Sequence, residues 1–152
     1  MSLTCQRETC AQIIEDIKPL IVRHWREIAL HQDEVPLDPD YAKYKKLEAA
    51  GALCIVSCRR DAALVGYSIF FLNRHIHYKG CFMASNDVLF LDAPERKGTA
   101  GLKLIRESER ILEGLGVKRV IWHIKPKHDF SPILRRFGYE QEEIIMGKLL
   151  GG

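Results

Sequence analysis

The spacing of hydrophobic residues predicts that the first third of the chain is helical. Between Glu8 and Leu30, apolar residues recur at three- and four-residue intervals, the period of one helix face. The stripe consists of Ile13, Ile14, Ile17, Leu20, Ile21, Trp25 and Ile28. Pro19 falls within this pattern and is expected to kink or divide the helix. After a loop rich in turn-forming residues, Asp40 can cap a short second helix from Tyr41 to about Ala50, which Gly51 stops.

The middle of the chain changes to short apolar runs separated by turn residues, which is typical of strands. Strands are predicted at Ala52–Cys58 and Leu64–Leu72, with a hairpin turn over Arg59–Ala63. A third strand is predicted to end at Val88–Leu91, while the strand extents between Asn73 and Ser85 stay open. Because short turns join antiparallel neighbours, this part of the sheet is expected to be antiparallel.

The last third alternates between the two periods. An amphipathic helix is predicted over Thr99–Leu115, followed by a strand at Lys118–Ile124 that a helix of this length allows to run parallel to the third strand. A short helix is predicted from Ser131 to Gly138, and final strands within Tyr139–Leu150. The expected order is ααβββαβαββ, an α+β fold with a mixed sheet flanked by helices.

Composition narrows the class of protein. The 152 residues contain 47% hydrophobic and 28% charged residues, as expected for one globular domain spanning residues 1–152. The net charge of +3 is mild and acidic residues are mixed among the basic ones, which argues against a nucleic-acid partner. No apolar stretch approaches the ~18 residues of a membrane span, so no membrane partner is expected.

Cysteine and histidine usage predicts neither a disulfide framework nor a metal site. The five cysteines form no CxxC pair, and an odd count argues against systematic pairing, so we expect a reduced, cytoplasmic protein. They are Cys5, Cys10, Cys54, Cys58 and Cys81. His75 and His77 alternate as strand neighbours would, but no further ligand stands beside them at a suitable spacing.

The segment FLDAPERKGTAGLKLI, from Phe90 to Ile105, combines an apolar run, adjacent basic residues, a glycine-rich turn and the start of a helix. Glycine allows close approach of the main chain, and the unpaired N–H groups of a first helical turn attract anions, most often phosphate. The plainer interpretation is a strand entering a helix, with Arg96 and Lys97 as solvated charges. Neither GxxxxGK[ST] nor GxGxxG occurs, so a nucleoside triphosphate or dinucleotide is not indicated.

In this order of elements, the segments VLFLDAPERKGTAGLKLI and VKRVIWHI...ILRRFGYE resemble the GNAT superfamily of acyl-CoA-dependent N-acyltransferases. The likeness covers about residues 50 to 150 well. The segment ASNDVLFLDAPERKGTAGLKLI also resembles acetyltransferase-like proteins carried by phages and prophages. The resemblance implies that main-chain N–H groups of the turn bind the pyrophosphate of coenzyme A, and that two splayed strands receive its pantetheine arm. The cofactor-binding residues it implies are Phe90, Leu91, Arg96, Lys97, Gly98, Thr99, Ala100, Gly101 and Leu134. Thr99 replaces a glycine usual in the family.

The resemblance also implies a catalytic base on the third strand. Ser85 falls near the family position, and Asp87, two residues on, shares its strand face, so Asp87 is the candidate base. Its alternative role is a hydrogen bond to local main chain. The tyrosine that many family members use as acid is replaced by Leu134, and an asparagine near Lys127 is missing. Tyr139, His77 or water is then the expected proton source.

In the family, the first two helices, their loop and the final hairpin build the acceptor pocket. The resemblance therefore implies Trp25, Glu27, Tyr41 and His77 as substrate-binding candidates, together with His24 and Tyr44. Trp25 lies on the apolar stripe and is also a core candidate, and Glu27 is a candidate for a surface pair with Arg23.

Together these expectations predict an N-acetyltransferase. Its cofactor is acetyl-CoA, with coenzyme A as the carrier of the acetyl group, and its acceptor is a small-molecule or peptide amine. The amine attacks directly and forms a tetrahedral intermediate, because no base accompanies a cysteine that could act as nucleophile. The alternative is a non-catalytic acyl-CoA-binding or phage-associated interaction module, which the absent tyrosine favours. Family members are often dimers, so a homodimer is one expected assembly.

Overall fold

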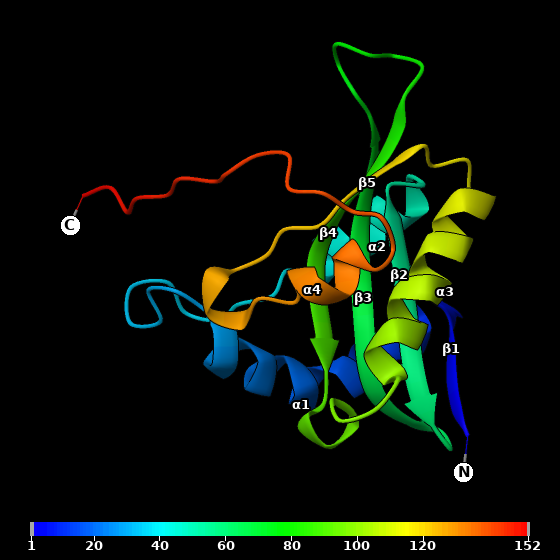
Figure 1. Ribbon diagram of the computed structural model, residues 1–152. Coiled ribbons are helices and arrows are strands. Elements are labelled where there is room, and N and C mark those ends of the chain that lie inside the picture. The colour runs from blue at the N-terminus through cyan, green and yellow to red at the C-terminus, as the bar shows by residue number, and fades with distance from the viewer. Residues whose placement is uncertain (1, 152) are drawn as a thin grey trace.

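A mixed sheet with helices on both faces organises the chain (Figure 1). The computed structural model describes residues 2–151. The strands lie in the order β1-β2-β3-β4-β5, antiparallel except for the parallel pair β4 and β5. They span β1 (Leu3–Glu8), β2 (Leu53–Arg60), β3 (Ala63–Arg74), β4 (Phe82–Leu91) and β5 (Arg119–Ile121). The helices are α1 (Cys10–Ile28), α2 (Tyr41–Ala49), α3 (Ala100–Gly114) and α4 (Ser131–Arg135), with 3₁₀ turns η1 (Ala93–Glu95) and η2 (Pro126–His128).

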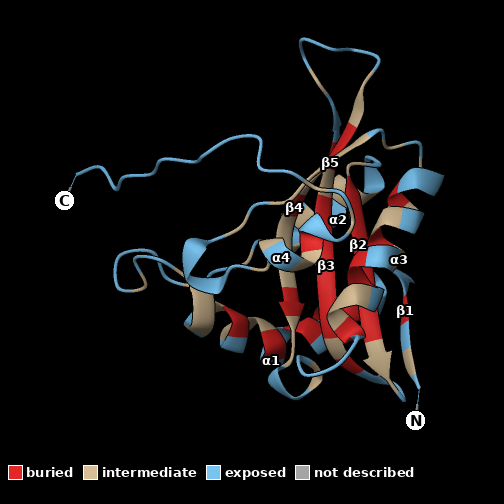
Figure 2. Cartoon of the chain, viewed as in Figure 1, coloured by how far each residue is buried: buried red, intermediate tan, exposed pale blue. Residues whose placement is uncertain are grey.

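The central strands are buried on both faces because each face meets a helix layer (Figure 2). Along β2, Leu53 and Ile55 pack with α1, whereas Cys54 and Val56 pack with the α3 side, as the two-residue period of a strand requires. On α3, the buried residues recur at helical spacing and face the sheet. The predicted α+β fold with a mixed sheet is confirmed.

Two local predictions hold in detail and one does not. The Asp40 side chain accepts a hydrogen bond from the Lys43 main chain at 2.9 Å, which caps α2 as expected. Gly51 follows α2 with φ at 72°, a conformation that glycine adopts without strain. Pro19, however, does not divide the helix, since it lies inside the continuous helix α1 with buried residues on both sides of it, whereas a kink at this residue stays a prediction from the sequence.

The chain ends differ from the predicted order. The strand β1 precedes α1, and Glu8 belongs to it rather than to the helix. No strand forms in residues 139–150 of the described chain, so the two final strands are wrong. In that segment Ile144, Ile145, Met146 and Leu150 are exposed, and the segment extends away from the body of the molecule (Figure 1). Apolar character alone does not form a strand, because a strand also needs a neighbour and a face to cover.

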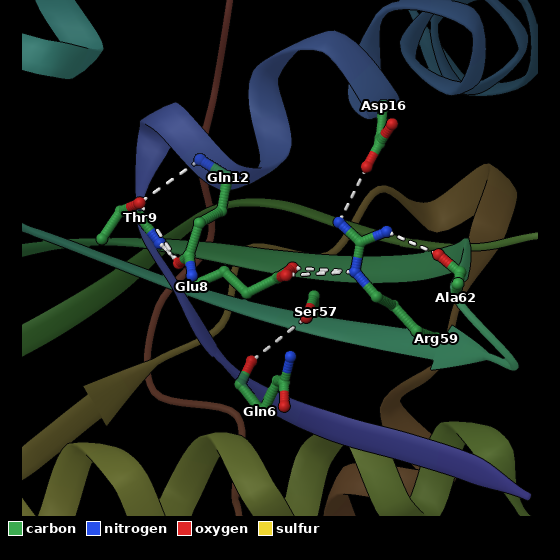
Figure 3. Close-up of polar contacts among 8 residues, drawn as sticks. All are labelled: Gln6, Glu8, Thr9, Gln12, Asp16, Ser57, Arg59 and Ala62. Atoms are coloured by element: carbon green, nitrogen blue, oxygen red, sulfur yellow. Dashed lines mark hydrogen bonds and ion pairs between the residues drawn. The ribbon is translucent and has the colours of Figure 1, made fainter.

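A network of polar side chains attaches β1 to the rest of the fold (Figure 3). Arg59 of β2 donates to the buried carboxylate of Glu8 at 3.0 Å and to Asp16 of α1 at 2.8 Å. Thr9 and Gln12 form a reciprocal capping box at the start of α1. A buried carboxylate needs such a partner, and Arg59 lies 51 residues away in the sequence. This long-range dependence explains why the pattern of the first eight residues did not predict a strand.

The structure contains a disulfide between Cys5 and Cys58, so the prediction that the cysteines form none is wrong. The two residues are direct partners in the β1–β2 register, with their Cα atoms 4.1 Å apart. Cys10, Cys54 and Cys81 are free. An odd number of cysteines still allows one disulfide, and only the placement of β1 beside β2 brings this pair together. None of the helices in residues 2–151 combines the length and apolar character that crossing a bilayer requires.

Candidate active site

An irregularity in β4 creates the feature on which the site is built. Ile69 of β3 pairs with Val88, but its neighbour Phe70 pairs with Asn86, so Asp87 is an extra residue and forms a β-bulge. A bulge increases the local twist and bends its strand. Over the described residues, β4 pairs with β5 only through Met83–Ser85, and the ladder ends just before the bulge. The second half of β4 therefore separates from β5.

Asn86 bridges the two strands at the point of separation. Its side-chain oxygen accepts a hydrogen bond from the main-chain N–H of His123, beyond the end of β5. From there to Leu91, β4 has no ladder with β5, and this length of strand corresponds to roughly 16 Å at ~3.3 Å per residue. An unpaired edge of a strand offers main-chain donors and acceptors to an extended ligand.

The bulge directs Asp87 toward helix α2. The hydroxyl of Tyr44 donates a hydrogen bond to the Asp87 carboxylate. Burial raises the pKa of Asp87, and the hydrogen bond from Tyr44 opposes this rise without cancelling it. Burial also raises the pKa of Tyr44, with the neighbouring carboxylate acting in the same direction, so this hydroxyl stays protonated. The pair is a half-buried carboxylate with a fixed donor, an arrangement that suits proton transfer.

A cavity of about 380 Å³ opens beside this pair. The second half of α1 forms one wall, the loop between α1 and α2 forms another, and Tyr44, Asp87 and Val88 close it. Lys125, which follows β5, completes the lining and donates to the Ile28 carbonyl at 3.2 Å. His128 contacts the Glu27 carbonyl at 2.6 Å, so the segment after β5 is held against the end of α1. The cavity therefore depends on segments about 100 residues apart in the sequence.

His24 lies at the inner side of this cavity and is uncharged at neutral pH. It is 4% exposed, and its ring lies 5.1 Å from that of Phe90, measured between ring centroids. Burial lowers its pKa to about 4. His24 thus contributes an aromatic surface and no positive charge.

A second hollow, of about 430 Å³, lies at the N-terminus of α3. Lys97, Gly98, Thr99 and Ala100 line it, together with Lys103 from the first helical turn. Thr99 is the N-cap residue, but its side chain makes no capping hydrogen bond, and no acidic residue occupies the first turn. The first N–H groups of any helix lack partners within the helix, so this end of α3 can bind an anion.

Charges around this hollow also suit an anion. Its one carboxylate, Glu95, is paired with Arg60 at 2.7 Å, and this contact lowers the pKa of Glu95. Lys103 donates to the Leu3 carbonyl, which brings the start of β1 to the rim. Lys97 and Lys103 therefore line a hollow in which the one carboxylate of the described residues is already paired. The residues fit a phosphate group, as the sequence predicts for this turn.

The predicted cofactor-binding residues fall into two groups. The first group lines the hollow at the N-terminus of α3 and consists of Lys97, Gly98, Thr99 and Ala100. The other predicted residues do not line it. Arg96 turns back to donate to the Leu91 carbonyl at 2.6 Å and to Glu27 at 2.7 Å. Gly101 lies where an added Cβ would stand 3.9 Å from Leu91 and Ile133 side-chain atoms, between α3, β4 and α4. Phe90 and Leu134 are each 3% exposed, so their side chains belong to the core.

The predicted catalytic and acceptor residues are also divided. Asp87 and Trp25 line the cavity, and Glu27 pairs with Arg96 instead of Arg23. The Tyr139 hydroxyl donates to Glu109 of α3 at 3.3 Å, and its ring packs against Trp122. His77 lies in the exposed turn between β3 and β4, Tyr41 contacts Lys18 on α1, and Ser85 pairs across to Ile121. None of these four lines the cavity beside Asp87.

Sequence reasoning named Tyr44 only as one of several pocket candidates and missed its contact with Asp87. It also missed Asn86, whose bridge to His123 marks the end of the ladder. The sequence ASND carries an indirect signal, since three polar residues in succession are unusual within a buried strand.

By sequence, the chain matches neither a protein-family model nor a curated protein. Solved structures do share its fold. An aminoglycoside acetyltransferase from an uncultured soil metagenomic sample matches with a TM-score of 0.77 and 11% identity, over 100% of both chains. Glucosamine-6-phosphate N-acetyltransferase from Arabidopsis thaliana matches with a TM-score of 0.73 and 10% identity, over 99% of both. A predicted acetyltransferase with acetyl-CoA from Clostridium acetobutylicum matches with a TM-score of 0.69 and 8% identity, over 98% of this chain and 97% of that one. The chain therefore has the GNAT-like fold of these acetyltransferases.

Proposed function

We propose that this protein is an N-acetyltransferase, which transfers the acetyl group of acetyl-CoA to a primary amine by direct attack. The observation that carries the proposal is the position of Asp87. It is the bulged residue of β4, it lines the cavity, and β4 leaves β5 at the same point. A half-buried carboxylate thus lies where an amine in the cavity would meet a ligand extended along the free edge of β4.

The N-terminus of α3 supports the use of acetyl-CoA. The first N–H groups of α3, with Lys97 and Lys103, would bind the diphosphate, and the unpaired edge of β4 would bind the pantetheine arm. When bound, acetyl-CoA supplies a thioester carbonyl open to attack. Between Val88 and Leu91, the main-chain N–H groups of β4 that do not point toward β3 are the donors available to polarise that carbonyl. The side chains of Phe90 and Leu134 take no part, since both are in the core.

Asp87 would accept the proton that an ammonium must lose before its nitrogen can attack. Because burial raises the pKa of Asp87, the carboxylate is a stronger base than an exposed aspartate, while Tyr44 keeps it oriented. The two residues predicted to supply a proton to the leaving thiolate, Tyr139 and His77, lie outside the cavity. Water is the remaining predicted source.

Ligand binding tests the cofactor assignment directly. In a thermal-shift experiment, acetyl-CoA and coenzyme A should raise the melting temperature, whereas ATP should not, since stabilisation follows ligand concentration over Kd. Gly101→Leu should abolish the shift because the side chain would enter the space between α3, β4 and α4. The matched control is Gly114→Leu at the other end of the same helix, where nothing lies within 4 Å of an added Cβ. An equal shift with ATP would contradict the assignment.

Turnover tests the chemistry. Release of the coenzyme A thiol from acetyl-CoA should require an amine, and Asp87→Asn should lower kcat/KM by about 10²–10⁴. An amine-independent rate, or an unchanged rate in the variant, would contradict the role of Asp87.

One observation favours a second candidate function, a non-catalytic acyl-CoA-binding or phage-associated interaction module. Leu134 stands where many similar enzymes have a tyrosine, and it is buried. This alternative predicts a thermal shift with acetyl-CoA and no thiol release with any amine. A cytoplasmic location, a homodimer and the closer likeness to phage proteins stay predictions from the sequence.

A further inference from the structure

The charges in the cavity beside Asp87 are few. Among residues 2–151, its lining contains two carboxylates, Asp38 and Asp87, and one ammonium group, that of Lys125. His24 is buried and neutral, and the nearby carboxylate of Glu27 is paired with Arg96. The cavity therefore carries at most one net negative charge, and none when Asp87 holds a proton. A ligand with several ammonium groups would find no partners for most of them.

The remaining surface of the cavity is apolar and partly open to solvent. Ile21, Trp25 and Ile28 contribute from α1, and Leu30, Val35 and Leu37 contribute from the loop. Leu30 is 61% exposed and Val35 is 50% exposed, although both are large apolar side chains. Apolar side chains gathered around a concave site mark a place where an apolar group binds.

The volume limits the part of the acceptor that lies inside the cavity. At about 380 Å³, the cavity lies near the lower end of the roughly 300–1,000 Å³ typical of small-molecule sites. It accommodates a small molecule, or one end of a larger molecule that extends into solvent through the open side.

Given the proposed N-acetyltransferase function, on which this step rests, we propose that the acceptor is a small monoamine with an aryl or alkyl body. Its nitrogen lies at Asp87, and its body lies against Trp25 and the apolar residues of the loop. The amine nitrogen forms the amide bond as the thioester C–S bond breaks. Of the two protons that the ammonium loses, one leaves through Asp87 to solvent and one ends on the thiol.

The test compares amines in one thiol-release assay with acetyl-CoA. Phenethylamine and hexylamine represent the proposed class, and spermidine and a polycationic aminoglycoside represent the opposite one. The monoamines should have kcat/KM values at least about tenfold higher, because each unpaired ammonium in an apolar site is costly. Equal or higher values for the polycations would overturn the inference while leaving the acetyltransferase function in place.

A pair of variants tests whether the loop surface sets this preference. Val35→Asp adds a carboxylate to the cavity at an exposed position, so it should lower kcat/KM for phenethylamine and raise it for spermidine. Ile76→Asp is the matched control, since Ile76 is 93% exposed in the β3–β4 turn and does not line the cavity. An unchanged ratio of the two amines in Val35→Asp would refute the inference. If no amine releases thiol, the proposed function fails as well, and acetyl-CoA binding then identifies the non-catalytic alternative.

Discussion

The hydrogen bond between Tyr44 and Asp87 gives a prediction that separates catalysis from folding. Tyr44→Phe removes the only atom that makes this bond and leaves the ring in place. The bond stabilises the charged carboxylate, and it opposes the rise in pKa that burial causes. The variant should therefore raise the pKa of Asp87 further.

The magnitude follows from the strength of such bonds. A hydrogen bond to a charged group contributes about 1.5–3 kcal/mol, and one pKa unit corresponds to about 1.4 kcal/mol. The pKa of Asp87 should thus rise by about one to two units. Since a general base acts in its ionised form, the acidic limb of the kcat/KM profile should move to higher pH by the same amount. On that limb, kcat/KM should fall by about 10- to 100-fold, with a smaller loss on the plateau.

Two measurements check the shift. The first is the pH dependence of kcat/KM with a monoamine, and the second is the carbon-13 NMR titration of the Asp87 carboxyl, which needs no turnover. Tyr41→Phe is the matched control, because Tyr41 lies in the same helix and contacts Lys18 rather than Asp87. An unmoved limb together with an unmoved carboxyl titration in Tyr44→Phe would refute the reasoning. A moved titration with an unmoved limb would remove Asp87 from the mechanism.

Three further predictions concern stability. The Cys5–Cys58 disulfide spans 53 residues, so its reduction should lower the free energy of unfolding by about 4 kcal/mol. Thiol titration of the unfolded protein should find three thiols before reduction and five after it. Five thiols before reduction would refute the bond. Burial lowers the pKa of His24 to about 4, whereas in the unfolded state its pKa is near 6.5. Between these two pH values only the unfolded state takes up the proton, so the free energy of unfolding should fall by about 3 kcal/mol as the pH drops to 4. His24→Leu should flatten this fall in denaturant titrations. Gly66→Ala would bring a Cβ within 2.9 Å of a β4 carbonyl oxygen and should lower the melting temperature, whereas Gly80→Ala, with open space around it, should not; equal melting temperatures would contradict the close approach.

Much of the fold could be predicted because its signals are local. Helix α3 shows its full amphipathic period, and α2 is bounded by a capping aspartate and a glycine with positive φ, all within a few residues. The hairpin of β2 and β3 has its turn at Asp61 and Ala62, inside the predicted segment. The glycine-rich turn before α3 was also recognised from neighbouring residues, and it lies at the second hollow.

The remaining features depend on residues far apart in the sequence. Glu8 is buried in β1 only because Arg59 meets it, and Cys5 bonds with Cys58 only because β1 lies beside β2. The apolar residues near the C-terminus were predicted to form strands, yet they find no neighbouring strand. A periodic pattern reports how one segment can bury a face, but it carries no information on which segment will cover it.

The candidate site divides in the same way. The amino-acid sequence by itself determined the glycine-rich turn at the start of α3 and the presence of an aspartate on the third predicted strand. Only the tertiary structure decided that Asp87 forms a bulge, that Tyr44 bonds to it, and that the α1–α2 loop surrounds it with apolar side chains. The physical reason is range. Caps, turns and helix faces arise from interactions over a few residues, whereas the cavity beside Asp87 is assembled from α1, the α1–α2 loop, α2, β4 and the chain after β5.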